Sequence, residues 1–166
     1  ARPVSQLDGY LTAISRQGNT LSCGAGASLI ATCRAAAENS LSGLEWGFGI
    51  PGSLGGGVYM DAGAYGGELR DARTEVTSLD EAGEYRTLPA AALGLSYRHS
   101  IFEERPGCVI VEAVLTLTPG EETAIRAAME DYMSRRREKQ PLEYGSAGST
   151  FKRPVGNYAS ALVDQC

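Results

Sequence analysis

The sequence predicts an α+β fold in which a mixed or antiparallel sheet is flanked by helices, and three observations favour this fold. Residues 108–117 form a β-branched and largely apolar run that is typical of a strand. Residues 73–79 and 84–88 flank Glu-Ala-Gly at 81–83, which is the pattern of a hairpin. Residues 121–138 have apolar side chains at helical spacing, so we expect a long helix that packs on the sheet.

The first part of the chain alternates between short regular elements and glycine-rich turns. Residues 20–24 alternate modestly between apolar and polar types and predict a strand that ends in the turn Gly24-Ala25-Gly26. Ser28 is a suitable N-cap for the alanine-rich helix that follows. Residues 43–67 contain too many glycines for one regular element, so we expect a loop, a short helix starting near Pro51 and a second loop.

The last part of the chain predicts a domain boundary. One face of the long helix carries Ala124, Ile125, Ala128, Met129 and Tyr132. Pro141 ends this helix and the composition changes to glycine, serine and lysine, so we divide the chain into residues 1–140 and 141–166. Residues 158–166 resemble the start of an amphipathic helix with nothing to cover its apolar face. The sequence therefore predicts a truncated piece of a longer protein.

The composition narrows the range of functions. The 166 residues carry a net charge of −5 and are 43% hydrophobic, which supports a buried core and argues against general nucleic-acid or membrane-surface binding. No run approaches the roughly 20 apolar residues that cross a bilayer. His99 is the only histidine and no C-x-x-C spacing occurs, so we expect no metal site. We expect the basic run at residues 135–139 to face solvent at a helix end.

The cysteines are typical of a cytoplasmic protein with reduced, mostly buried thiols. They are Cys23, Cys33, Cys108 and Cys166.

Residues 49–57, Gly-Ile-Pro-Gly-Ser-Leu-Gly-Gly-Gly, could cradle a phosphate. Consecutive small residues let backbone amides converge, and the start of a helix adds positive potential. The segment is neither a dinucleotide-binding fingerprint nor a Walker motif, because no Gly-Lys-Ser/Thr follows it. Close packing and tight turns explain such glycines equally well, so the pattern alone leaves both interpretations open.

Three longer motifs make the chain similar to a known family. The first joins Leu-Glu-Trp-Gly-Phe-Gly-Ile-Pro-Gly at 44–52 to Asp-Ala-Gly-Ala-Tyr-Gly at 61–66. The second is Tyr-Arg-His-Ser-Ile-Phe at 97–102, and the third is Gly-Ser-Ala-Gly-Ser-Thr-Phe-Lys-Arg-Pro at 145–154. In this order they resemble the UDP-N-acetylenolpyruvoylglucosamine reductases along the whole chain. The resemblance implies the second subdomain of a vanillyl-alcohol-oxidase-like FAD-binding fold, followed by the start of a substrate domain.

The resemblance places the first motif at an FAD site, with main-chain groups around the pyrophosphate and the flavin. The contacts that it implies are Gly49, Ile50, Pro51, Gly52, Gly55, Gly56, Ala62, Gly63, Ala64 and Tyr65. The chain departs from the family pattern at Asp61, where the family usually has asparagine. A carboxylate lacks the donor of an amide and adds negative charge near a pyrophosphate. FAD binding would therefore be weaker, unless the side chain points away.

The other two motifs imply the reactive groups. By the resemblance, Arg98 holds the substrate carboxylate, which suits a bidentate guanidinium, and Ser149 is the proton donor. The resemblance also implies Lys139, Lys152 and Arg153 as charges on the substrate side. Without it, Arg98 would be interpreted as a surface ion pair, Ser149 as a turn serine and Lys139 as a solvent-facing charge. We expect His99 to be exposed and assign it no role.

The whole protein implied by the resemblance uses FAD and NADPH to reduce UDP-N-acetylglucosamine enolpyruvate to UDP-N-acetylmuramate in peptidoglycan precursor synthesis. It is similar to the shorter subtype, which lacks a tyrosine-bearing substrate loop. The family's first FAD-binding element and its C-terminal catalytic glutamate have no counterpart here, so we expect an inactive chain with poor FAD affinity. The surface left by a missing domain would favour self-association. Two alternatives stay open: a non-catalytic flavin-binding or interaction module of this fold, and another FAD oxidoreductase such as an alcohol or glycolate oxidase.

Overall fold

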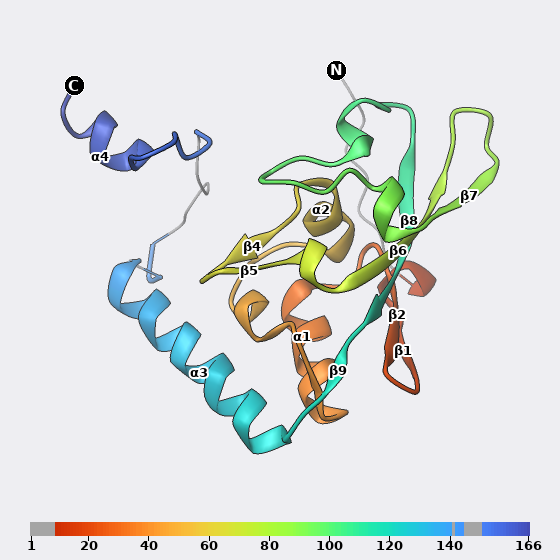
Figure 1. Ribbon diagram of the computed structural model, residues 1–166, viewed down its shortest axis with the longest axis horizontal. Coiled ribbons are helices and arrows are strands. Elements are labelled where there is room, and N and C mark those ends of the chain that lie inside the picture. Colours follow the sequence, from red (N-terminus) through yellow and green to blue (C-terminus); the bar gives the residue numbers. More distant parts are fainter. Residues whose placement is uncertain (1–8, 141, 145–150) are drawn as a thin grey trace.

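The computed structural model describes residues 9–140, 142–144 and 151–166. The fold is built on a five-stranded sheet in the order β1-β2-β8-β6-β7, in which every neighbouring pair is antiparallel. Its strands are β1 (Ile14–Gln17), β2 (Thr20–Gly24), β6 (Arg73–Leu79), β7 (Tyr85–Leu88) and β8 (Val109–Thr116). Helices lie on one side of this sheet (Figure 1), so the α+β prediction is confirmed, with an antiparallel sheet.

Two of the four helices in the described residues begin at a capping serine. The four helices are α1 (Leu29–Glu38), α2 (Leu54–Tyr59), α3 (Glu122–Lys139) and α4 (Ala159–Val163). Ser28 caps α1 as predicted, because its hydroxyl accepts the N–H of Ala31 at 3.0 Å. α2 begins later than the expected Pro51, since Gly52 has a φ of +148°, which no helix contains, and Ser53 is the cap.

Short elements connect these parts. Two two-residue ladders pair β3 (Leu41–Ser42) with β9 (Thr118–Pro119) and β4 (Gly63–Ala64) with β5 (Gly67–Glu68). The single 3₁₀ turns are η1 (Gly9–Thr12), η2 (Glu45–Gly47), η3 (Leu69–Asp71), η4 (Ala90–Ala92) and η5 (Ile101–Glu103).

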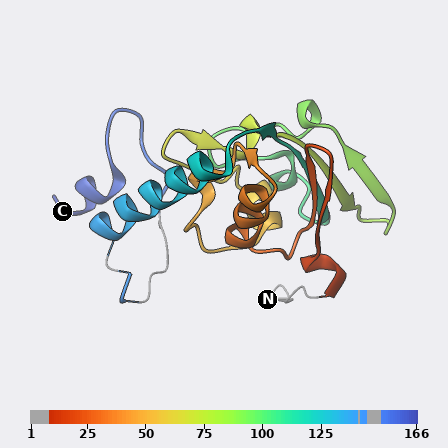
Figure 2. The same cartoon turned by 90° about the horizontal axis from the view of Figure 1, so that it is seen from below.

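The long helix α3 packs differently from the prediction. It lies against α1, η2 and β3, on the side of the molecule away from the five-stranded sheet (Figures 1 and 2), because α2 already covers β8 and β2. Ile125 and Met129 are buried and Tyr132 is half-buried, as expected. Ala124 is exposed, which contradicts the prediction, because it lies about 100° around the helix from Ile125 and off the buried stripe.

A bulge in β8 positions the glycine-rich segment. β8 carries one extra residue, Val111, opposite β6, and its carbonyl oxygen accepts the N–H of Ala25 at 2.9 Å. The carbonyls of Ala25 and Ala27 then accept the N–H groups of Gly55 and Leu54 at 2.8 and 2.7 Å. The start of α2 is therefore fixed to the centre of the sheet through backbone hydrogen bonds alone.

The buried cluster extends from Leu21 to Met129. No residue of the described segment 151–166 is buried, and α4 is shorter than the helix expected at 158–166. The division at residue 141 stays a prediction.

Candidate functional site

The glycine-rich segment opens to solvent at its first turn. Pro51 and Gly52 are exposed, and nothing lies within 4 Å of the place where a Cβ of Gly52 would stand. Within the described part of the chain, the amide nitrogens of Gly52 and Ser53 have no hydrogen-bond partner. Gly56 is also exposed, and its N–H donates to the Ser53 hydroxyl at 3.2 Å. Free amides on an open loop before a helix form a donor set for an anionic group.

Two other glycines of this segment serve packing. A Cβ on Gly55 would stand 2.8 Å from the Cβ of Ala25, and a Cβ on Gly57 would stand 3.2 Å from the side chain of Leu69. Both glycines are buried, so Gly55, an expected cofactor contact, faces the core of the protein. Close packing therefore explains Gly55 and Gly57, whereas Gly52 and Gly56 fit a phosphate cradle.

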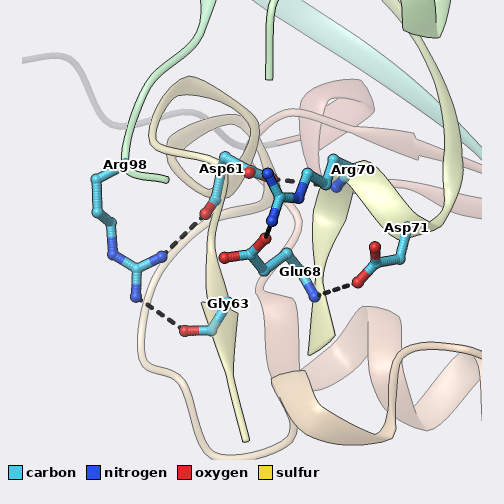
Figure 3. Close-up of polar contacts among 6 residues, drawn as sticks. All are labelled: Asp61, Gly63, Glu68, Arg70, Asp71 and Arg98. Atoms are coloured by element: carbon cyan, nitrogen blue, oxygen red, sulfur yellow. Dashed lines mark hydrogen bonds and ion pairs between the residues drawn. The ribbon is translucent and has the colours of Figure 1, made fainter. Parts of the chain in front are cut away.

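Arg98 clamps the second half of the segment. Its Nη1 and Nη2 donate to the carbonyl oxygens of Asp61 and Gly63, both at 2.9 Å (Figure 3). The buried hydroxyl of Ser100 donates to the carbonyl of Tyr59 at 2.7 Å and holds the same turn. The structure thus brings Arg98 to the candidate cofactor loop, where its half-buried guanidinium contacts main-chain carbonyls.

The side chain of Asp61 is fully buried inside this loop. Its Oδ1 accepts the N–H of Arg70 at 3.1 Å, and its Oδ2 has no partner among the described residues. Burial raises the pKa of the Asp61 carboxyl, against the opposing effects of the Arg70 N–H and of the Arg70 and Arg98 charges. Of the two outcomes left open for Asp61, the structure shows the side chain turned away from the exposed glycines.

α3 brings two side chains to the loop that sequence analysis did not single out as ligands. Tyr132 stacks on Tyr65, with the ring centroids 4.9 Å apart and the ring planes 15° from parallel. The guanidinium carbon of Arg136 lies 6.0 Å from the Tyr65 ring centroid. The Nε of Arg136 is buried without a partner among the described residues, 3.2 Å from the place where a Cβ of Gly49 would stand. This N–H is a further donor at the edge of the loop.

The interpretation of the basic run as solvent-facing is therefore correct for Arg135, Arg137 and Lys139 and wrong for Arg136. Arg135 and Arg137 form exposed ion pairs with Asp131 and Glu130, at 2.7 and 2.9 Å. Arg136 instead continues the buried stripe of α3 at helical spacing. That spacing is the signal that could have identified it.

The segment after residue 150 contacts the Arg98 loop through Tyr97. The N–H of Arg153 donates to the hydroxyl of Tyr97 at 3.2 Å, and the ring of Tyr97 lies 5.2 Å from the Arg98 guanidinium carbon. The guanidinium of Arg153 itself lies over the ring of Tyr158, 4.0 Å from the centroid. Tyr97 thus contacts both the guanidinium of Arg98 and the main chain of Arg153.

The other candidates are less closely connected. Lys152 is exposed. The hydrogen bond with His99 is the main cause that lowers the pKa of Glu103, and the charge of Lys152 lowers it further. His99 is half-buried, with its Nδ1 2.9 Å from Glu103, so the expectation of an exposed histidine is wrong. Lys139 is exposed in the last turn of α3. Ser149 lies outside the described residues.

The backbone of the site is unusual. Four non-glycine residues in the described ranges have a positive φ, and three of them belong to the site: Asp61 at 42°, Tyr65 at 54° and Arg98 at 55°. Such residues are uncommon and collect at functional sites.

Other parts of the molecule offer fewer candidates. In residues 9–140, 142–144 and 151–166 no cluster of metal-ligating side chains occurs, and none of the helices there has the length and apolarity to span a bilayer. A cavity of about 550 Å³ lies between the β6–β7 hairpin and the start of β8, and no candidate site residue lines it. Cys23 and Cys33 are buried, Cys108 is half-buried and Cys166 is exposed, all as free thiols.

Comparison with known proteins gives a family match. Residues 4–89 match the family described as FAD binding domain. The chain is 46% identical over 155 residues to a UDP-N-acetylenolpyruvoylglucosamine reductase of Levilactobacillus brevis, covering 93% of the chain and 51% of the relative. It is 51% identical over 143 residues to that of Agathobacter rectalis, covering 86% and 45%.

A solved structure is similar as well. The crystal structure of the UDP-N-acetylenolpyruvylglucosamine reductase from Thermus caldophilus superposes with a TM-score of 0.83 and 33% identity. The superposition covers 96% of this chain and 57% of that one. The chain spans about half the length of the curated relatives that it matches.

Proposed function

The chain belongs to the FAD binding domain family, and we propose that it is the FAD-binding part of a UDP-N-acetylenolpyruvoylglucosamine reductase. The identity of 46% and 51% to curated reductases supports this proposal. We further propose that the FAD-binding part comprises residues 1–140 and that a substrate domain starts at residue 141.

The open set of donors on the glycine-rich loop carries this proposal. FAD contains a pyrophosphate, and the free amides of Gly52 and Ser53 can donate to its oxygens. Gly52 and Gly56 leave the approach clear of side chains, and the guanidinium of Arg136 brings positive charge beside Gly49 and Tyr65. The residues present therefore fit FAD.

The contacts implied by the resemblance are proposed to differ in role. The exposed and half-buried positions would contact FAD: Gly49, Ile50, Pro51, Gly52, Gly56, Ala62, Gly63, Ala64 and Tyr65. Gly55 would act indirectly, because its absent side chain lets α2 pack on Ala25.

When bound, FAD would carry a hydride from NADPH to the enolpyruvyl ether of a UDP-sugar. Arg98 would hold the turn from Asp61 to Gly63 and bring positive charge to the loop, where a substrate carboxylate is attracted. Lys139 would bind the substrate diphosphate, and Lys152 and Arg153 would add positive charge on the substrate side. Ser149 stays the proposed proton donor. We place this reaction in the cytoplasm, in peptidoglycan precursor synthesis, since its reactants are NADPH and a nucleotide sugar.

An FAD titration of the purified chain, followed by quenching of flavin fluorescence, tests this proposal. We expect saturable binding that the substitution Ser53→Asp weakens by about tenfold, because a negative charge at a helix start repels an anion there by roughly 1–2 kcal/mol. Aspartate caps helices as well as serine does, so α2 should persist. Ala82→Asp, on the exposed β6–β7 turn, is the control with the same charge change and should bind like the unaltered chain.

Two results would contradict the proposal. If the folded chain binds no FAD, its loop is not a sufficient flavin cradle. If both aspartate substitutions weaken FAD binding equally, the effect is one of general charge and not of the loop. An NADPH oxidation assay with the UDP-sugar substrate addresses activity. We expect essentially no turnover by this chain alone.

A further inference from the structure

Asp61 is a buried carboxyl group in the candidate cofactor loop without a cation of its own. Its side chain is 0% exposed, and one oxygen has no partner among the described residues. Two guanidinium groups lie near, and both are engaged elsewhere (Figure 3): Arg98 by the carbonyls of Asp61 and Gly63, and Arg70 by the carboxylate of Glu68. Neither guanidinium donates to the carboxyl, so an ionised Asp61 would be buried without a direct ion pair among the described residues, which is unfavourable.

Three charged groups act on Asp61: Glu68 of β5, Arg70 of η3 and Arg98 of the loop before η5. Glu68 and Arg70 are paired with each other, and the guanidinium of Arg98 donates to main-chain carbonyls and not to the carboxyl. The one hydrogen bond of the Asp61 side chain, from the N–H of Arg70 to Oδ1, does not require the charge, because a neutral carboxyl group also offers a carbonyl oxygen.

We propose that Asp61 is a positioning residue for the cofactor loop and that its protonation tightens the turn that Arg98 clamps. Asp61 joins two parts of the loop: its side chain accepts from Arg70, and its carbonyl oxygen accepts from Arg98. Ionisation draws the carboxylate toward water and so moves the carbonyl that Arg98 clamps. Raising the pH should therefore loosen the turn and weaken FAD binding. The effect on FAD rests on the proposed function, whereas the ionisation of Asp61 does not.

The pH dependence has a defined sign. Burial raises the pKa of Asp61 in the folded chain above its ordinary value of 3.8. The folded state therefore binds this proton more tightly than the unfolded state does. The stabilising contribution is complete below the ordinary pKa and is lost as the pH rises through the raised pKa of the folded chain.

Thermal unfolding of the chain without FAD, over a series of pH values, tests the ionisation. Asp61→Asn keeps the shape of the neutral carboxyl and cannot ionise. Its unfolding midpoint should exceed that of the unaltered chain by a few degrees at about pH 8, where about 2–4 °C corresponds to 1 kcal/mol, and the difference should vanish near pH 4. Asp71→Asn removes an exposed carboxylate of the same loop and is the matched control. It should keep the pH dependence of the unaltered chain.

Two further measurements complete the test. A ¹³C titration of the Asp61 carboxyl should give a midpoint above 3.8, and a midpoint at or below that value overturns the proposal, even if Asp61→Asn fails to fold. Asp61→Asn should also bind FAD severalfold more tightly than the unaltered chain at about pH 8 and equally near pH 4. Equal affinity at both pH values would refute the positioning role. If no variant binds FAD, the proposed function fails, while unfolding and ¹³C titration still decide the ionisation of Asp61.

Discussion

Burial gives the four cysteines different reactivities. Burial raises the pKa of the Cys23 thiol to about 11 and that of Cys33 to about 12, so few thiolates form at neutral pH. We expect Cys166, which is exposed, to be alkylated first in the native chain, and Cys108 more slowly. Cys23 and Cys33 should react only after unfolding. Mass spectrometry after timed iodoacetamide labelling checks this order, and rapid native labelling of Cys33 would contradict it.

The burial of two single residues, Asp61 and Arg136, was not predicted from the sequence. The motif identified Asp61 as an unusual residue of the candidate cofactor loop. Its burial could not be predicted, because it depends on Arg70 and Arg98, which are 9 and 37 residues away. Arg136 was missed although helical spacing places it on the buried stripe of α3; its Nε is covered because α3 packs on Gly49.

Among the elements, α3 is expected to support the cofactor loop through one aromatic contact. Replacing Tyr132 by alanine removes the stack on Tyr65, and aromatic pairs contribute about 0.5–1.5 kcal/mol. FAD affinity should fall by roughly twofold to tenfold. Tyr132→Phe retains the ring and should restore the affinity in the same fluorescence titration. If phenylalanine binds as poorly as alanine, the stack is not the cause.

Helices and strands whose signals lie next to them in the sequence were predicted well, whereas the elements against which they pack were not. The Ser28 cap lies next to the helix that it starts, and the β6–β7 hairpin has its turn signal between its two strands. The apolar stripe of α3 predicts a helix that packs, but it does not say on what. α2 is short and rich in glycine, yet it occupies the face of β8 and β2 and leaves α3 to pack elsewhere.

For the whole molecule, we expect the fold to depend on residues 9–140. The buried cluster ends at Met129, and the described residues 151–166 contribute nothing to it. A chain that ends at Gln140 should therefore unfold within about 2 °C of the full 166 residues. Differential scanning calorimetry of both chains measures this. A loss of many degrees would show that the contact between Tyr97 and Arg153 is part of a larger stabilising interface.

The left-handed backbone of Asp61, Tyr65 and Arg98 has a consequence for engineering this protein. Each such residue costs about 1 kcal/mol that glycine would not, in domains whose total stability is only about 5–15 kcal/mol. Glycine at Tyr65 would remove this cost together with the stack on Tyr132, and glycine at Arg98 would remove it together with two hydrogen bonds that hold the loop. Variants of this loop must therefore be screened for ligand retention as well as heat tolerance, because the backbone cost is offset by contacts that glycine cannot make.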